Sequence, residues 1–278
     1  MNNNIPDLLA HEIPIVESFY TIQGEGFHAG KPAYFIRTGG CDVGCHWCDV
    51  KESWDENDHP IITVKEIVKK SMEFSDCVVV TGGEPLMWKI HWEAMKRIVE
   101  LGYQDQVLAR YNSNMSRINF YKYNLFDDIL KHFPNWQICA SIDGTGEVGE
   151  YIRTGLKYDE WKANMKYGLQ FVKQQNQRMQ LDLTITLPGL FDLENMVLLS
   201  NELNIELLTK QVFNFSNDNA MAPLFMPYDV MSEIIDDARE KTIKYKNRKL
   251  SNFFGQLDEM QKQKRNNELV YDCLLYTS

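Results

Sequence analysis

The sequence predicts an α/β protein built as a partial (β/α)6 barrel. Short apolar segments rich in β-branched and aromatic residues alternate along the chain with amphipathic segments of helix length. The 278 residues suffice for one large α/β domain with a sizeable core. Strand–helix–strand alternation implies right-handed crossovers and parallel strands, so functional residues are expected at the C-terminal ends of the strands.

Seven segments are predicted as strands because they are short and enriched in residues that favour strands: 17–21, 33–38, 77–81, 106–111, 137–143, 181–186 and 206–213. Helices are predicted between them, the first starting after Thr63 and the others spanning 90–101, 124–133, 158–175, 192–203 and 228–247. Thr63 and Glu66 have the spacing of a capping box. Asp159 and Asp192 are predicted as N-caps.

The domain organisation is predicted as one large domain between two short ends. Residues 1–12 read as an N-terminal tail and 13–250 as a single domain. Residues 251–278 read as a polar C-terminal segment without a clear apolar stripe.

Charge and hydropathy limit the partners of the protein. A formal net charge of −10 argues against nucleic acid or an anionic membrane as the main partner. No apolar run approaches the ~20 residues that span a bilayer. The first residues, MNNNIPDLLAHEIP, lack the basic and apolar regions of a secretory signal. We therefore expect a cytoplasmic protein.

Three of the six cysteines lie within eight residues, in the stretch GGCDVGCHWCDVKESW. Cys41, Cys45 and Cys48 follow the strand 33–38 with the spacing C-x3-C-x2-C. In a reducing cytoplasm such a group indicates a metal site more often than a disulfide. Cys77 and Cys139 lie in apolar segments and are interpreted as small core residues.

Three kinds of site could use these thiols. A zinc site could take His46 or His59 as a fourth ligand, but zinc ligands usually come as two pairs. A redox dithiol of Cys45 and Cys48 would leave Cys41 without a role. An iron–sulfur cluster with three thiolate ligands uses all three cysteines and leaves one iron open for a reactive ligand.

The cysteine spacing, with Trp47 directly before the last cysteine, resembles that of radical S-adenosylmethionine enzymes. The stretch VVVTGGEP strengthens the resemblance. It implies a 4Fe–4S cluster bound by the three cysteines, whose open iron binds S-adenosylmethionine and whose electron releases a 5′-deoxyadenosyl radical. The turn of Gly82, Gly83 and Glu84 would hold the cofactor's amino group. Trp47, Cys48 and Asp49 would border the cofactor.

Residues 13–88 closely resemble the 7-carboxy-7-deazaguanine synthases. The resemblance implies a lyase that converts 6-carboxy-5,6,7,8-tetrahydropterin into 7-carboxy-7-deazaguanine with loss of ammonia, on the route to queuosine. It also implies a flavodoxin-like electron donor and is compatible with a homodimer. The implied substrate contacts are Ile22, Gln23, Gly24, Arg37 and Thr81.

Two of the implied features can be weighed from the residues themselves. Arg37, at a strand end, can bind a carboxylate through two parallel hydrogen bonds. Many relatives bind Mg²⁺ through a threonine that follows the Cys-Asp pair. Val50 stands there in this chain and its side chain offers no oxygen ligand, which puts the Mg²⁺ that the resemblance implies in doubt.

Residues from about 84 to 255 resemble a different radical S-adenosylmethionine group, related to peptide-modifying members. The stretches RYNSNMS and ASIDGTGEVGEYIRTG carry this resemblance. It implies that Asn112, Ser113, Asn114, Ser141 and Asp143 line the cofactor site. The same residue types favour turns, so loop capping is the alternative.

The residues leave three functions open. The first is a 7-carboxy-7-deazaguanine synthase-like lyase. The second is a radical S-adenosylmethionine enzyme acting on another substrate, such as a peptide. The third is a non-catalytic zinc-binding interaction module.

The change of resemblance near TGGEPLMW (81–88), a motif that both groups carry, predicts that the chain is not one intact natural gene product. Misjoined sequence reads at this motif would explain the change, and natural recombination is the alternative. The last six residues, CLLYTS (273–278), also match the translation of a common sequencing adapter, so we expect them to be an artefact. Weak or absent turnover of the pterin would follow from such a join. A long sequencing read that carries codons 70 to 278 without interruption and a stop directly after Ser278 would contradict this expectation.

Overall fold

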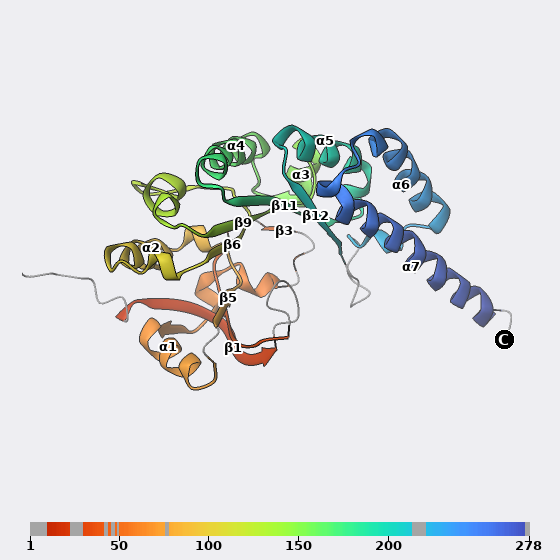
Figure 1. The fold of residues 1–278 in the computed structure, drawn as a ribbon. Coiled ribbons are helices and arrows are strands. Elements are labelled where there is room, and N and C mark those ends of the chain that lie inside the picture. The colour runs from red at the N-terminus through yellow and green to blue at the C-terminus, as the bar shows by residue number, and fades with distance from the viewer. Residues whose placement is uncertain are drawn as a thin grey trace, which may run out of the picture. The chain divides into compact units, whose positions relative to one another are not determined.

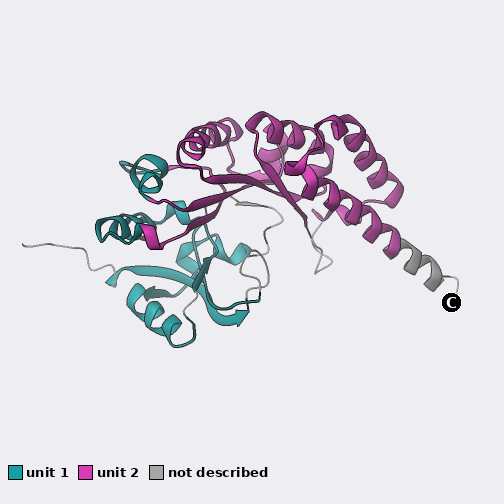
Figure 2. Ribbon diagram, in the orientation of Figure 1, with its two compact units in different colours: residues 1–44, 48–104, 119–132 teal, residues 45–47, 105–118, 133–278 magenta. Residues whose placement is uncertain are grey.

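The computed structural model describes residues 10–22, 30–41, 44, 45, 48, 50–75, 78–212 and 221–275, with backbone alone at 44, 45, 90 and 267–275. The chain forms two compact units (Figures 1 and 2). Unit 1 consists of Met1–Gly44, Cys48–Gln104 and Asn119–His132, and unit 2 of Cys45–Trp47, Asp105–Ile118 and Phe133–Ser278. The single domain expected over residues 13–250 stays a prediction. Each unit combines a four-stranded sheet with helices, which confirms the α/β class.

Unit 1 contains a mixed sheet in the order β4-β1-β2-β5. Its strands are β1 (Glu12–Ile22), β2 (Pro32–Thr38), β4 (Ile61–Thr63) and β5 (Val78–Thr81). β1 runs antiparallel to both β2 and β4, whereas β2 and β5 are parallel, as the alternation pattern predicts. The carboxyl ends of β2 and β5 therefore lie at the same edge of the sheet.

The other regular elements of unit 1 are α1 (Val64–Met72), α2 (Lys89–Glu100) and the short strands β7 (Asn119–Phe120) and β8 (Tyr123–Asn124). The capping box is confirmed, because Glu66 N donates to Thr63 Oγ1 at 3.3 Å and Thr63 N donates to Glu66 Oε2 at 3.1 Å. α1 packs one face of the sheet, where Ile67 joins Ile15, Tyr34 and Ile36 in a buried core. The two-residue strand β3 is Gly44–Cys45.

Unit 2 contains a parallel sheet in the order β12-β11-β9-β6. Its strands are β6 (Ala109–Ser113), β9 (Trp136–Ile142), β11 (Arg178–Ile185) and β12 (Glu206–Gln211), and the short β10 is Arg153–Thr154. Its helices are α3 (Gly146–Ile152), α4 (Tyr158–Gln175), α5 (Leu193–Leu203), α6 (Tyr228–Thr242) and α7 (Ser251–Leu275). In Figure 1, α3, α4 and α5 lie on one side of this sheet.

Several predicted elements differ in detail from the observed ones. Strand 106–111 begins later, as β6, because a 3-10 turn occupies Gln104–Gln106. Helix 124–133 is shortened to a π-helical turn and a 3-10 turn, Leu125–Ile129 and Leu130–His132. Lys157, not Asp159, is the N-cap residue of α4. Asp192 is at the N-cap position of α5 but makes no capping hydrogen bond there.

The segment after residue 250 differs most from the expectation of a polar tail. α7 buries Phe253, Phe254, Leu257 and Met260 and packs against β12 and α6. At least its first ten residues thus contribute to the core of unit 2. None of the helices in the described part of the chain is long and apolar enough to cross a membrane.

Lowering the pH from 7 to 5 is expected to destabilise the protein through His91 on α2. Burial of the imidazole lowers the pKa of His91 from its ordinary 6.5 to about 4. The unfolded chain therefore binds this proton first, so the stability contributed by His91 is lost as the pH falls through 6.5 towards 4. Because the residue is only partly buried, we expect a loss of about 1 to 2 kcal/mol. Urea denaturation of the wild type and of His91→Asn at both pH values measures it, and an unchanged pH dependence in the variant would contradict it.

Candidate functional site

The loop that carries the first cysteine is fixed by backbone hydrogen bonds at the end of β2. Gly40 N donates to Ser53 O at 2.8 Å, and Cys41 N donates to Trp54 O at 3.3 Å. The thiols of Cys41 and Cys48 are both half-buried. The side chain of Cys45, and Trp47 and Asp49 as a whole, lie outside the described residues, so the three-thiolate site stays a prediction.

The Gly-Gly-Glu turn lies directly against this cysteine loop. Gly82 and Gly83 follow β5 with φ angles of +78° and +54°, a conformation that disfavours side chains. A Cβ on Gly83 would lie 2.3 Å from Gly40 O, and one on Gly82 would lie 2.6 Å from Thr38 O. Glu84 N donates to Gly40 O at 3.0 Å. The structure thus brings together the cysteine loop and the turn that the sequence singled out separately.

Glu84 has a structural contact that the sequence did not reveal. Its side chain is 2% exposed, and Oε1 accepts a hydrogen bond from Leu86 N at 3.2 Å. The carboxylate thereby caps the 3-10 turn Pro85–Met87. A contact between Glu84 and a cofactor stays a prediction.

A hollow of about 430 Å³ opens beside the first cysteine. It is lined by Gly40, Cys41, Trp54, Asp55, Glu56, Asn57 and Met87. Trp88 Nε1 is buried nearby without a hydrogen-bond partner in the described part of the chain. A Cβ on Gly40 would lie 3.4 Å from this nitrogen and 3.6 Å from Glu56 Oε2. The hollow and its surroundings thus combine the thiol of Cys41, the N–H donor of Trp88 and the open backbone of Gly40. These groups fit a thiolate-bound cluster and a ligand on it.

Arg37 lies one strand away from the turn, on the face of the sheet opposite α1. Its Nη1 forms an ion pair with Glu17 Oε1, the residue directly opposite on β1. In the parallel register, Arg37 is aligned with Thr81 of β5, so these two candidate substrate residues are neighbours. Ile22 is 62% exposed at the end of β1. Gln23 and Gly24 lie outside the described residues.

The candidate residues after β6 in unit 2 make local turn contacts. Ser113 Oγ accepts from Met115 N at 2.9 Å, and Asn114 Oδ1 accepts from Ser116 N at 2.8 Å. These are the loop-capping bonds that the sequence left as an alternative. Asn112 is exposed on β6 and Ser141 half-buried on β9. Cofactor contacts by these four residues stay predictions.

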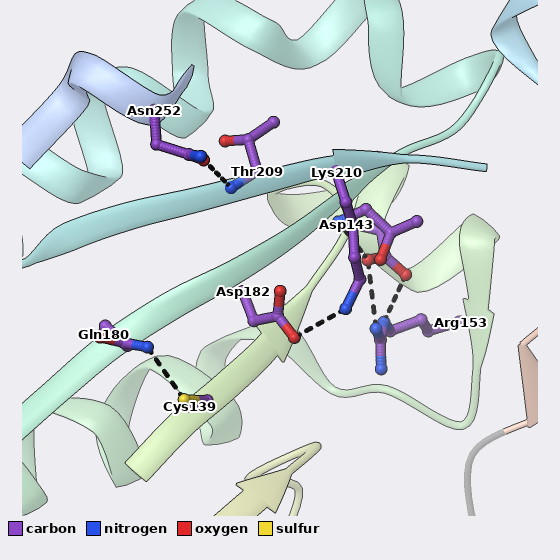
Figure 3. A network of polar contacts seen from close by, with 9 residues as sticks. Cys139, Asp143, Arg153, Gln180, Asp182, Thr209, Lys210 and Asn252 are labelled. Atoms are coloured by element: carbon purple, nitrogen blue, oxygen red, sulfur yellow. Dashed lines mark hydrogen bonds and ion pairs between the residues drawn. The ribbon is translucent and has the colours of Figure 1, made fainter. Parts of the chain in front are cut away.

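Asp143 belongs to a buried ion pair (Figure 3). Arg153 donates to it through Nε at 2.6 Å and Nη2 at 3.1 Å, and Thr184 N donates to its Oδ1 at 3.2 Å. The carboxylate of Asp143 is fully buried and the side chain of Arg153 is 6% exposed. We therefore interpret Asp143 as a residue that fixes the end of β9, and its predicted cofactor contact as untested.

Figure 3 also shows two cross-strand contacts of β11. Gln180 Nε2 donates to the thiol of Cys139 at 2.9 Å, and Lys210 of β12 pairs with Asp182 at 2.9 Å. Cys139 is 4% exposed, which confirms its interpretation as a core residue. Cys77 lies outside the described residues.

Sequence reasoning missed four residues that shape these sites. Arg153, Glu17 and Trp88 were given no role, although all three lie in stretches that carry a resemblance, and Asp192 was interpreted as a helix cap. Asp192 accepts hydrogen bonds from the backbone N and the hydroxyl of Thr145, the latter at 3.2 Å, and so connects the start of α3 with that of α5. The sequence does show acidic and basic residues near the ends of strands. It does not show which of them pair with one another.

Comparisons with known proteins agree with this geometry. The family profile described as the Radical SAM superfamily matches residues 35–190. The 7-carboxy-7-deazaguanine synthase of Flavobacterium psychrophilum is 60% identical over 76 residues, which are 27% of this chain and 36% of that protein. The synthase of Escherichia coli is 37% identical over 95 residues, with 27% of this chain and 43% of that protein covered. The chain thus spans less than half the length of these two relatives.

One solved structure is similar over much of the chain. The crystal structure of Streptococcus suis SuiB bound to precursor peptide SuiA has a TM-score of 0.51 at 13% sequence identity, and the match covers 75% of this chain and 46% of that chain. At this identity the likeness concerns the fold alone.

Proposed function

Because the chain belongs to the radical SAM superfamily, we propose that it acts as a 7-carboxy-7-deazaguanine synthase-like lyase. The proposed substrate is 6-carboxy-5,6,7,8-tetrahydropterin, and the products are 7-carboxy-7-deazaguanine and ammonia. The synthases that match the chain support this substrate class. The observation that carries the proposal is the contact between the cysteine loop and the Gly-Gly-Glu turn. The hydrogen bond from Glu84 N to Gly40 O stabilises this contact.

In this proposal Cys41, Cys45 and Cys48 bind a 4Fe–4S cluster as thiolates. When bound, the cluster supplies the electron that cleaves S-adenosylmethionine into methionine and a 5′-deoxyadenosyl radical. The half-buried position of Cys41 and Cys48 limits the access of water to the thiolates. Gly82 and Gly83 let the turn approach the cysteine loop without a side chain in between.

Arg37 would bind and orient the substrate carboxylate. The guanidinium has five donors, and Nη1 alone is bonded to Glu17, so a second carboxylate can be bound through the remaining nitrogens. Thr81, aligned with Arg37 on the neighbouring strand, offers a hydroxyl to the same ligand. A substrate held at both points would present a fixed edge to the radical.

The proposal extends to partners and location. We propose a flavodoxin-like electron donor, which the resemblance to the synthases implies, and a cytoplasmic location, in line with the oxygen-sensitive chemistry of a cluster. Val50 supplies only its backbone carbonyl, which accepts from Ser53 Oγ at 2.7 Å. We therefore propose no Mg²⁺ site at this position.

The test is an anaerobic assay of the reconstituted protein with S-adenosylmethionine, a reductant and the carboxylated pterin. We expect a brown protein that releases ammonia and 7-carboxy-7-deazaguanine. A colourless protein that binds zinc and forms no 5′-deoxyadenosine would overturn the assignment. A brown protein that forms 5′-deoxyadenosine but leaves the pterin unchanged would retain the cofactor chemistry and reject the substrate.

Arg37→Ala is expected to raise the KM for the carboxylated pterin and to leave slow, uncoupled cleavage of S-adenosylmethionine intact. The reason is that Arg37 is assigned to the substrate carboxylate and not to the cofactor. Loss of one charged hydrogen bond weakens binding by about 1.5–3 kcal/mol, or about 10- to 150-fold. Arg97→Ala, which removes a half-buried arginine of α2 that is paired with Glu100, is the matched control and should react like the wild type. Equal kinetics for both variants would remove Arg37 from the site.

A further inference from the structure

The sheet of unit 1 has two unlike faces. On the face covered by α1, Tyr34 and Ile36 pack with Ile67, and the ring of Tyr34 stacks on Phe74 with centroids 5.6 Å apart. Neighbouring residues of a strand point to opposite faces. Phe19 and Phe35 therefore belong to the other face, and so do Glu17 and Arg37.

Two aromatic rings stack on each other in parallel on this second face. Phe19 of β1 and Phe35 of β2 are directly opposite in the register. Their ring centroids are 5.5 Å apart, and their planes differ by 3°. Phe19 is 37% exposed and Phe35 is half-buried, so the rings keep surface available for a ligand. A planar heterocycle can stack on such rings in the offset manner that aromatic pairs prefer.

The next side chain of β2 on the same face is the positively charged Arg37. Arg37 follows Phe35 by two residues, which places the two side chains roughly 6–7 Å apart along the strand. This spacing suits a bicyclic ring that carries a carboxylate on its edge. Glu17 binds Arg37 from β1 through a single guanidinium nitrogen, and Thr81 is aligned with Arg37 on β5.

We propose that this face of the unit 1 sheet is a stacking site for a flat heterocyclic carboxylate. The ring system extends this stack on the face of Phe35 that is turned away from Phe19, Arg37 binds the carboxylate, and Glu17 is a positioning residue that fixes the guanidinium. The inference rests on the proposed function, and it adds Phe19, Phe35 and Glu17 to the substrate site. A small anionic ligand suits this site, because Glu17 uses Nη1 of Arg37 and the other guanidinium nitrogens can donate to a carboxylate at the end of the aromatic pair.

The test measures binding apart from turnover. Pterin-6-carboxylate, a stable aromatic relative of the proposed substrate, is dialysed to equilibrium against the cluster-loaded protein with S-adenosylmethionine. We expect Phe35→Leu to weaken binding about 10-fold, which corresponds to about 1.4 kcal/mol, whereas Phe35→Tyr should bind within about 3-fold of the wild type because it keeps the ring. Phe74→Leu is the matched control, since Phe74 stacks on the opposite face, and it should bind like the wild type.

Glu17→Gln separates positioning from stacking. It should weaken binding of pterin-6-carboxylate but not of pterin, which lacks the carboxylate and depends on Phe35 alone. If the wild type does not bind the probe, or if Phe35→Leu binds it as tightly as Phe35→Tyr does, the stacking site is refuted. Equal losses in Phe35→Leu and Phe74→Leu would also refute it, because they would indicate a general loss of stability.

The outcome is distinguishable from a failure of the proposed function. A wild type that binds the probe in a Phe35-dependent manner but does not convert the carboxylated pterin retains the stacking site and loses the proposed reaction. A wild type that converts the pterin, together with a Phe35→Leu variant of equal KM and affinity, retains the reaction and loses the stacking site.

Discussion

Replacing any one of Cys41, Cys45 and Cys48 with alanine is expected to reduce cleavage of S-adenosylmethionine to the background level. In the proposed site each thiolate is one of three protein ligands, and two thiolates would not hold the cluster with its open iron in place. The fold should survive, because Cys41 lies in a loop after β2 whose backbone is bonded to Ser53 and Trp54 independently of the thiol. Formation of 5′-deoxyadenosine and the iron content of the reconstituted protein are the measurements.

Cys139→Ala is the matched control for the three variants. Cys139 is a buried cysteine of unit 2 whose thiol accepts a hydrogen bond from Gln180. The Cys139→Ala variant should have a lower melting temperature than the wild type and should still cleave S-adenosylmethionine. Full 5′-deoxyadenosine formation by any variant of the loop cysteines would show that its thiol is no cluster ligand.

Arg153→Met is expected to lower the free energy of unfolding by about 3–5 kcal/mol, the range found when one partner of a buried ion pair is removed. The substitution leaves the carboxylate of Asp143 fully buried without its guanidinium. Arg178→Met on the neighbouring strand removes a partner of Glu206 from a pair in which the arginine is 59% exposed, and it should change stability by no more than about 1 kcal/mol. Urea denaturation measures both.

A second substitution distinguishes an uncompensated charge from lost packing. Asp143→Asn in the Arg153→Met background removes the charge but keeps an oxygen that can accept from Thr184 N. We expect the double variant to recover a large part of the lost stability. If it is as unstable as Arg153→Met alone, the unpaired carboxylate is not the cause.

The features that the sequence predicts well depend on neighbouring residues. The capping box of α1 needs only Thr63 and Glu66, three positions apart, and the structure has both of its hydrogen bonds. The positive φ angles of Gly82 and Gly83 follow from a residue type that adopts them without strain. Periodicity likewise located α4 and α5, whose apolar residues repeat at helical spacing.

The features that it does not predict depend on registers and on contacts between distant segments. Glu17 meets Arg37 because the pairing of β1 with β2 runs in one register from Ile22 and Pro32 to this pair, and the irregularity between Ile15 and Glu17 begins only beyond it. Arg153 reaches Asp143 because α3 returns the chain to the end of β9. The apolar stripe of α7 escaped notice because Phe253, Leu257 and Met260 stand among polar residues that the helix turns outward.

The contact between Gly40 and Gly83 has a consequence for how this protein can change. A side chain at position 83 would collide with the carbonyl of Gly40, and Gly40 itself has a φ of +98°. The two positions are therefore coupled, and neither can be diversified while the other loop keeps its path. In a mutant library that varies only the cysteine loop, the Gly-Gly-Glu turn after β5 would limit which substitutions are tolerated. Directed evolution of this site has to vary both loops together.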